Sequence, residues 1–239
     1  MSSQSDSDLR KEAADWLFNF PRLLDLYQHS DKRNPKNYFN VDFSMPLGNE
    51  ESRLTRLDLA SWKILRDKAA PLVSIDDSLR QHQFLWNVLD EASGYVFLAD
   101  QGYERIEFIE PDKSKKGGKQ SPDLVGYKNG STAILEVKTI NESRDNLAPD
   151  APWRTEAVVV RPELSEEFKR KVIATIEGKG EAKDQLQSYP HPTDRKIVLL
   201  VVRFDYGQKT GGHLYMELES FIASQNMKHG IEVYHQVAL

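Results

Sequence analysis

The sequence predicts an α/β protein in which helices flank a mixed β-sheet. The first observation is the order of apolar patterns from residue 75 onward, which runs helix, several strands, helix, strand, helix, strand. The second is the nearly continuous apolar run at 196–204, which is typical of a strand buried on both faces of a sheet. We expect this sheet domain to occupy residues 71–239.

Residues 1–70 are expected to form a helical elaboration of that domain. Apolar residues recur at helical spacing in 9–28, with a break near Pro21, and again in 52–68. The segment between them, 30–50, is rich in polar residues and prolines and is interpreted as a long loop.

The sheet domain is expected to begin with a helix that Asp76 or Asp77 caps and that Gly94 ends. Strand patterns follow at 95–99, 104–110, 124–128 and 132–140. Residues 164–189 are mostly apolar at helical spacing, with a helix break at Gly178-Lys179-Gly180. The remaining predicted elements are a strand at 196–204, a helix at 214–226 and a strand at 231–237.

Composition narrows the class of protein. The chain of 239 residues has no cysteine and a formal net charge of -5 at pH 7. The absence of cysteine excludes a disulfide framework, a cysteine zinc site and a thiol nucleophile. The negative charge disfavours a protein that coats nucleic acid by bulk charge, but it allows an enzyme that grips a few phosphates locally. No apolar run approaches the length of a membrane span, and we expect a cytoplasmic protein without a membrane partner.

The strongest local turn pattern in the chain is Lys128-Asn129-Gly130-Ser131. Asn-Gly between apolar runs favours a two-residue type I′ hairpin, because both residues accept a positive φ. Counting outward from that turn brings Asp123 directly opposite Glu136 across the two strands. Lys138 lies two residues beyond Glu136 and therefore points to the same face of the sheet. The sequence thus predicts two carboxylates and one ammonium at one end of a hairpin.

This group of side chains suits metal-assisted hydrolysis of a phosphodiester. Opposed carboxylates repel each other, and a divalent cation relieves that repulsion. Hard oxygen ligands suit Mg²⁺, with Mn²⁺ as an alternative. A nearby lysine orients a metal-bound water and stabilises developing negative charge. The competing interpretation is that Asp123 and Glu136 are solvent-facing strand residues whose charge Lys138 neutralises.

Ser121-Pro122-Asp123, followed by Ile134-Leu135-Glu136-Val137-Lys138-Thr139, resembles the motif of the PD-(D/E)xK superfamily, the restriction-endonuclease-like nucleases. Gln185-Leu186-Gln187-Ser188-Tyr189, in the helical segment before an apolar strand, is similar to the Gln-x-x-x-Tyr motif of RecB-type exonucleases. The resemblance covers the order of elements over roughly residues 75–204. It implies a restriction-endonuclease-like core, and residues 1–70 lie outside the resemblance.

The resemblance also implies a role for each residue of the hairpin. Asp123 and Glu136 would bind the metal ion, helped by the backbone carbonyl of Val137. Lys138 would position the attacking water. Together these residues are the predicted catalytic and metal-binding centre.

Three further residues are assigned to the site by the same resemblance. Gln185 and Tyr189 stand four residues apart on one predicted helix face, where they would contact substrate or support the site. An amphipathic surface turn is the competing interpretation of this pair. The family often places an acid or a histidine on the first core helix, and His82 is the best candidate for that metal ligand, with Gln83 as an alternative. An ordinary surface histidine is the competing interpretation of His82.

Lysines near the predicted centre are candidates for binding nucleic acid. Lys115, Lys116 and Lys119 lie in a glycine-containing loop just before Asp123, and Lys183 lies on the helix that carries the Gln-x-x-x-Tyr pattern. Such lysines would track a phosphate backbone. A solvated loop explains the first three equally well.

The sequence therefore predicts a Mg²⁺-dependent deoxyribonuclease whose partner is DNA. The first alternative is a nucleic-acid-binding protein that keeps the nuclease fold with weak or absent catalysis. The second is an interaction subunit of a larger DNA-processing complex, which would dock through residues 1–70. Oligomeric state and the choice between endonuclease and exonuclease are left open by the sequence.

Overall fold

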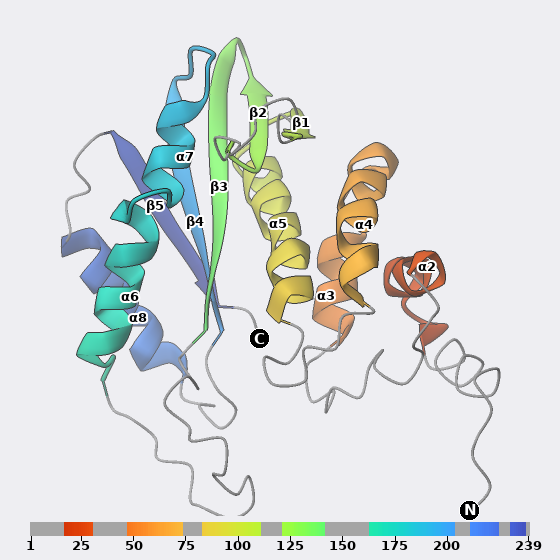
Figure 1. Cartoon of the computed structure of the whole chain (residues 1–239), viewed down its shortest axis with the longest axis horizontal. Coiled ribbons are helices and arrows are strands. Elements are labelled where there is room, and N and C mark those ends of the chain that lie inside the picture. The colour runs from red at the N-terminus through yellow and green to blue at the C-terminus, as the bar shows by residue number, and fades with distance from the viewer. Residues whose placement is uncertain are drawn as a thin grey trace, which may run out of the picture. The chain divides into compact units, whose positions relative to one another are not determined.

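The computed structural model describes residues 17–30, 47–73, 83–110, 121–141, 163–203, 211–224 and 230–237 (Figure 1). The chain divides into two compact units, Met1–Phe108 together with Leu239, and Ile109–Ala238. The boundary predicted from the sequence, between the helical elaboration and the sheet domain, lies earlier, after residue 70. In the part of the chain described, no helix is long and apolar enough to cross a membrane.

The first unit consists of helices followed by one short strand. Pro21 begins its first described helix, as expected for a residue whose missing N–H costs nothing in the first helical turn. Leucines on several helices are completely buried and form the apolar centre of this unit: Leu23, Leu26, Leu54, Leu65, Leu89 and Leu98. The elements are α2 (Pro21–His29), α3 (Leu47–Leu54), α4 (Leu59–Val73), α5 (Gln83–Asp100) and β1 (Arg105–Phe108).

The single helix expected over 52–68 is wrong, because two helices share that segment. Asp58 accounts for the break. Its carboxylate accepts a hydrogen bond from the Ser61 N–H at 2.7 Å, and its carbonyl accepts one from the Trp62 N–H at 2.9 Å. Asp58 therefore caps the start of α4, since a carboxylate satisfies an N–H that the first helical turn leaves unpaired.

The helix stop expected at Gly94 and the strand expected at 95–99 are also wrong. Gly94 lies inside α5, which continues to Asp100. The stop is at Gly102, whose φ is +82°. The Tyr103 N–H donates to the Leu98 carbonyl at 3.0 Å and the Gly102 N–H to the Ala99 carbonyl at 2.9 Å, which is the Schellman pattern of a helix end. Burial along α5 outweighs the roughly 1 kcal/mol that an internal glycine costs. The part of this helix expected from 76 to 82 lies outside the described residues.

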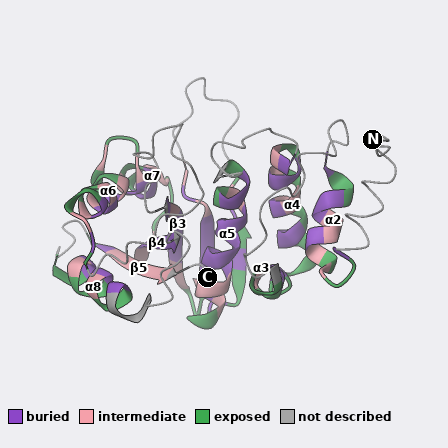
Figure 2. Ribbon diagram, turned by 90° about the horizontal axis from the view of Figure 1, so that it is seen from below, coloured by how far each residue is buried: buried purple, intermediate pink, exposed green. Residues whose placement is uncertain are grey.

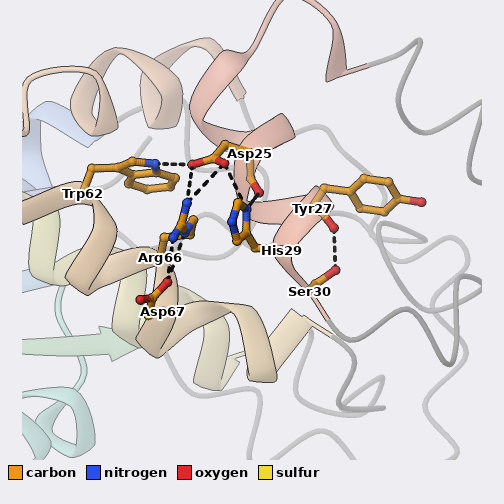
Figure 3. A network of polar contacts seen from close by, with 7 residues as sticks. All are labelled: Asp25, Tyr27, His29, Ser30, Trp62, Arg66 and Asp67. Carbon is orange, nitrogen blue, oxygen red and sulfur yellow. Dashed lines mark hydrogen bonds and ion pairs between the residues drawn. The ribbon is translucent and has the colours of Figure 1, made fainter. Parts of the chain in front are cut away.

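A polar network joins α2 to α4 within the first unit (Figure 3). The Asp25 carboxylate accepts a hydrogen bond from Trp62 Nε1 at 2.6 Å and lies 3.3 Å from Arg66 Nη1. His29 Nδ1 lies 3.0 Å from the same carboxylate. Because one side chain of α2 meets two side chains of α4, this network fixes how the two helices face each other.

The second unit carries four described strands and the helices that cover one of their faces (Figure 1). Within this unit the strands form a mixed sheet in the order β2-β3-β4-β5. β2 and β3 are antiparallel, whereas β3, β4 and β5 run parallel. The elements are β2 (Leu124–Lys128), β3 (Ser131–Asn141), α6 (Glu166–Glu177), α7 (Ala182–Ser188), β4 (Arg195–Arg203), α8 (Gly211–Ser224) and β5 (Ile231–Val237). The mixed α/β fold and the helix break at 178–180 are confirmed.

β4 confirms the prediction of a strand buried on both faces. Every residue from Ile197 to Val202 is buried (Figure 2). Its residues Val198, Leu200 and Val202 pack with apolar side chains of α6, α7 and α8. From β3, Ile134 and Ile140 join the same cluster. Glu136 and Lys138 lie between those two isoleucines with the two-residue period of a strand, so they face α6 and α7 as well.

Candidate active site

The predicted hairpin is confirmed, and its register is confirmed for the pairs from Lys128 opposite Ser131 to Leu124 opposite Leu135. Asn129 and Gly130 have φ of +50° and +80°, as a type I′ turn requires. Lys128 pairs with Ser131, and the ladder continues to Leu124 opposite Leu135. One step further out, the Asp123 N–H donates to the Leu135 carbonyl at 3.1 Å, so Asp123 and Leu124 both lie against Leu135, and the expected pairing of Asp123 with Glu136 is not among the pairs of the ladder.

Asp123 is held in place by the strand across from it. Its Oδ2 accepts a hydrogen bond from the Val137 N–H at 2.8 Å. The N–H and C=O of one strand residue point to the same edge, so the Val137 carbonyl is directed toward the Asp123 side of β3. β3 extends beyond the start of β2, and this overhang carries Glu136, Val137 and Lys138, with Asp123 bonded to the Val137 N–H.

Glu136 and Lys138 form a shielded ion pair. Lys138 Nζ lies 3.1 Å from Glu136 Oε1, and the side chains are 19% and 4% exposed respectively. The interpretation of these residues as solvent-facing is therefore wrong for Glu136, which is buried. A carboxylate is costly to bury unless a cation or several donors surround it. Glu136 thus occupies a position whose chemistry favours a nearby positive charge.

A second carboxylate, Glu181, also contacts Lys138. Glu181 Oε2 lies 3.3 Å from Lys138 Nζ, and its side chain is 44% exposed. Burial by itself lowers the pKa of Lys138, but Glu136 and Glu181 together raise that pKa above its ordinary value of 10.5. Lys138 is therefore a permanent cation at neutral pH, suited to stabilising negative charge and not to removing protons.

Gln185 and Tyr189 lie on the neighbouring helix and just beyond it. Gln185 is buried in α7, which packs against β3 and β4. Tyr189 is the C-cap of α7, one residue past its end, so the expected shared helix face stops short of it. The Tyr189 ring packs on the apolar cluster of the unit and meets His191 edge to face, with ring centroids 5.3 Å apart.

The other predicted site residues do not enter this geometry. His82, Lys115, Lys116 and Lys119 lie outside the described residues. Lys183 is described and lies partly exposed on α7. Its position two residues after Glu181 keeps it on the helix that borders the site.

Glu181 is the residue that sequence reasoning missed. It follows the glycine-containing break between α6 and α7, where the pattern indicated a turn and nothing more. The one usable signal was its spacing of four residues before Gln185, which is one helical turn. The backbone realises that spacing, since the Gln185 N–H donates to the Glu181 carbonyl at 3.1 Å.

The donor set fits a hard divalent cation only in part. Glu136 supplies a buried carboxylate on β3, and the Asp123 carboxylate lies against the Val137 N–H, at the strand edge to which the Val137 carbonyl is also directed. Oxygen ligands of this kind suit Mg²⁺ or Mn²⁺. Within the described ranges, no group of three or more His, Cys, Asp or Glu side chains is arranged to hold a metal ion. Mg²⁺ tolerates such a sparse set because it retains several waters.

Comparison with protein-family models, with curated proteins and with solved structures finds no match to this chain. The residues of the site therefore carry the functional proposal by themselves.

Proposed function

We propose that this chain is a metal-dependent nuclease that hydrolyses DNA phosphodiester bonds at a PD-(D/E)xK-type site in a restriction-endonuclease-like core. The observation that supports it is the shielded Glu136–Lys138 ion pair on β3, beside Val137, whose N–H donates to the Asp123 carboxylate at 2.8 Å. Packing of the apolar core does not require a carboxylate buried beside a lysine at the open end of a hairpin. A site that binds both a metal ion and a phosphate makes use of such a pair.

In this proposal Asp123, Glu136 and the Val137 carbonyl hold the ion, either Mg²⁺ or Mn²⁺. A bound ion of this kind activates water and neutralises charge on the phosphate. The Lys138 ammonium orients the attacking water and stabilises the negative charge that develops on the phosphoryl oxygens. Gln185 stands on the bordering helix, where it supports the site.

The test is cleavage of DNA by the purified protein with Mg²⁺ or Mn²⁺. Circular plasmid, linear duplex and single-stranded DNA separate endonuclease from exonuclease action. Asp123→Asn is the sharpest variant, because asparagine still accepts the Val137 hydrogen bond while the carboxylate charge is lost. We expect Asp123→Asn and Lys138→Ala each to lose at least about 100-fold in kcat, the usual cost of removing one electrostatic group from a centre.

Lys169→Ala is the matched control. Lys169 Nζ also lies 3.1 and 3.3 Å from two carboxylates, on Glu166 and Glu217, but it belongs to α6. Cleavage that survives EDTA, or that Asp123→Asn leaves unchanged, would refute the proposal of a metal-dependent nuclease at this site.

A second candidate function is a nucleic-acid-binding or interaction subunit with the same fold and little catalysis, acting within a DNA-processing complex. The sparse ligand set favours this second function, since the described residues include no group of three or more His, Cys, Asp or Glu side chains that could hold a metal ion. DNA binding that does not depend on divalent ions, without turnover on any substrate, is the result that selects this function.

A further inference from the structure

Lys138 is held by two carboxylates of different character. Glu136 is buried in the sheet, whereas Glu181 is partly exposed and stands at the turn before α7. The two lie at 3.1 and 3.3 Å from the same ammonium. Glu181 has no part in the hairpin motif, and nothing in the apolar cluster calls for a carboxylate there.

Under the proposed function, the Glu136 carboxylate interacts with two cations, the Lys138 ammonium and the divalent metal ion. A divalent ion on its carboxylate weakens the attraction that Glu136 exerts on Lys138 and adds a direct repulsion between the ion and the ammonium. Lys138 would swing into solvent if Glu136 were its one anchor, since a lysine side chain is long and flexible. Glu181 is a second anchor that the ion does not need.

We propose that Glu181 is a positioning residue, which keeps the Lys138 ammonium beside the site while Glu136 binds the metal ion. The inference rests on the proposed nuclease function and deepens it. Charge agrees with this role. Asp123, Glu136, Glu181 and Lys138 carry a net charge of about -2 in their ordinary ionic states, which one divalent ion cancels.

The turn that presents Glu181 is built tightly. Gly180 has a φ of +79°, and its N–H donates to the Asp184 carboxylate at 2.7 Å. A Cβ at Gly178 would lie 2.3 Å from the Ala174 carbonyl oxygen and 3.0 Å from Glu181 Cγ. The Glu181 N–H donates to the Gly178 carbonyl at 3.1 Å. Glu181 therefore starts from a backbone with little freedom, as a residue that places another side chain requires.

The test follows how readily the Lys138 amine is released from its carboxylates, by reductive methylation followed by mass spectrometry, because only an accessible, deprotonated amine reacts. In the wild type, Mg²⁺ should leave the labelling rate of Lys138 unchanged. In Glu181→Gln, Mg²⁺ should raise that rate about three- to fivefold, the effect expected for one partly exposed ion pair. Glu177→Gln is the matched control, because it removes an exposed carboxylate from the end of α6, and it should behave as the wild type.

A metal-free arm makes the result independent of ion binding. Glu136→Gln removes the first anchor, so labelling of Lys138 should then depend on Glu181 and should rise further in the double variant Glu136→Gln, Glu181→Gln. The proposal would be overturned if Glu181→Gln left the labelling rate of Lys138 unchanged both with Mg²⁺ and in the metal-free Glu136→Gln background. The circular dichroism spectrum must show that the variants are folded.

DNA cleavage separates this inference from the function on which it rests. For an active nuclease, Glu181→Gln should lower kcat and leave KM for DNA unchanged, because substrate contacts remain. A wild type that binds Mg²⁺ in calorimetry but cleaves no DNA refutes the nuclease, while the labelling still decides the role of Glu181. If the wild type cleaves DNA but Glu181→Gln does not change the labelling rate of Lys138, only the positioning role is refuted.

Discussion

Replacing Lys138 with methionine should destabilise the metal-free protein and make its stability depend on Mg²⁺. The substitution keeps an unbranched side chain one atom shorter than lysine but removes the positive charge 3.1 Å from Glu136. Glu136 is 4% exposed and cannot recover full hydration. Breaking a fully buried pair costs about 3–5 kcal/mol and an exposed pair less than about 1 kcal/mol. Because Lys138 itself is 19% exposed, we expect a loss of about 2–3 kcal/mol.

Urea unfolding followed by circular dichroism measures this loss in EDTA and again in saturating Mg²⁺. An ion that takes over the charge of Lys138 binds the variant more tightly, and tighter binding to the folded state adds stability by mass action. The difference between variant and wild type should therefore shrink in Mg²⁺. Lys169→Met serves as the control, because Lys169 also lies between two carboxylates, of Glu166 and Glu217, which are 83% and 22% exposed, but it lies on α6 and not on the hairpin. Its difference in stability from the wild type should therefore not respond to Mg²⁺.

Two outcomes would refute the reasoning. A Lys138→Met protein as stable as the wild type in EDTA would mean that Glu136 does not depend on this cation. A loss of stability that Mg²⁺ leaves unchanged would mean that no divalent ion reaches the pair of carboxylates.

Three further predictions concern the rest of the fold. Leu186→Ala should cost about 2–4 kcal/mol in urea unfolding, because Leu186 is fully buried between α7 and the sheet; a loss below about 1 kcal/mol would contradict that packing. Asp25→Ala should cost about 1–3 kcal/mol by stranding the Trp62 indole N–H, and a thermal melt unaltered by the change would argue against the network. Hydrogen bonds from Arg195 lower the pKa of Glu232 below its ordinary value of 4.5, so the stability they add is present at neutral pH and is lost as pH falls through that lowered pKa. Glu232→Gln should therefore be less stable by under about 1 kcal/mol at pH 7, and the difference should vanish in strong acid; a difference that persists there would contradict the assignment.

The helices show where sequence patterns fail. Gly94 was predicted to end a helix because glycine is the commonest residue just after a helix end. The residues before and after Gly94 are buried, and α5 continues to Asp100, with Gly102 as the actual stop. Asp58 looked like one more polar residue within an apolar period, yet its side chain begins a new helix. In both cases packing or a single cap outweighed a propensity worth about 1 kcal/mol or less.

The sequence by itself determined the hairpin and the shared face of Glu136 and Lys138. Asn129 and Gly130 set the turn, and the two-residue period of a strand set the faces. Counting outward also predicted Asp123 opposite Glu136, whereas in the structure the Asp123 N–H bonds to Leu135. All of these rules are local, because they act across a few residues of one hairpin. Only the tertiary structure decided that Glu181 meets Lys138. That contact depends on how α6 and α7 pack on the sheet, through apolar side chains from distant segments whose combined fit no local pattern encodes.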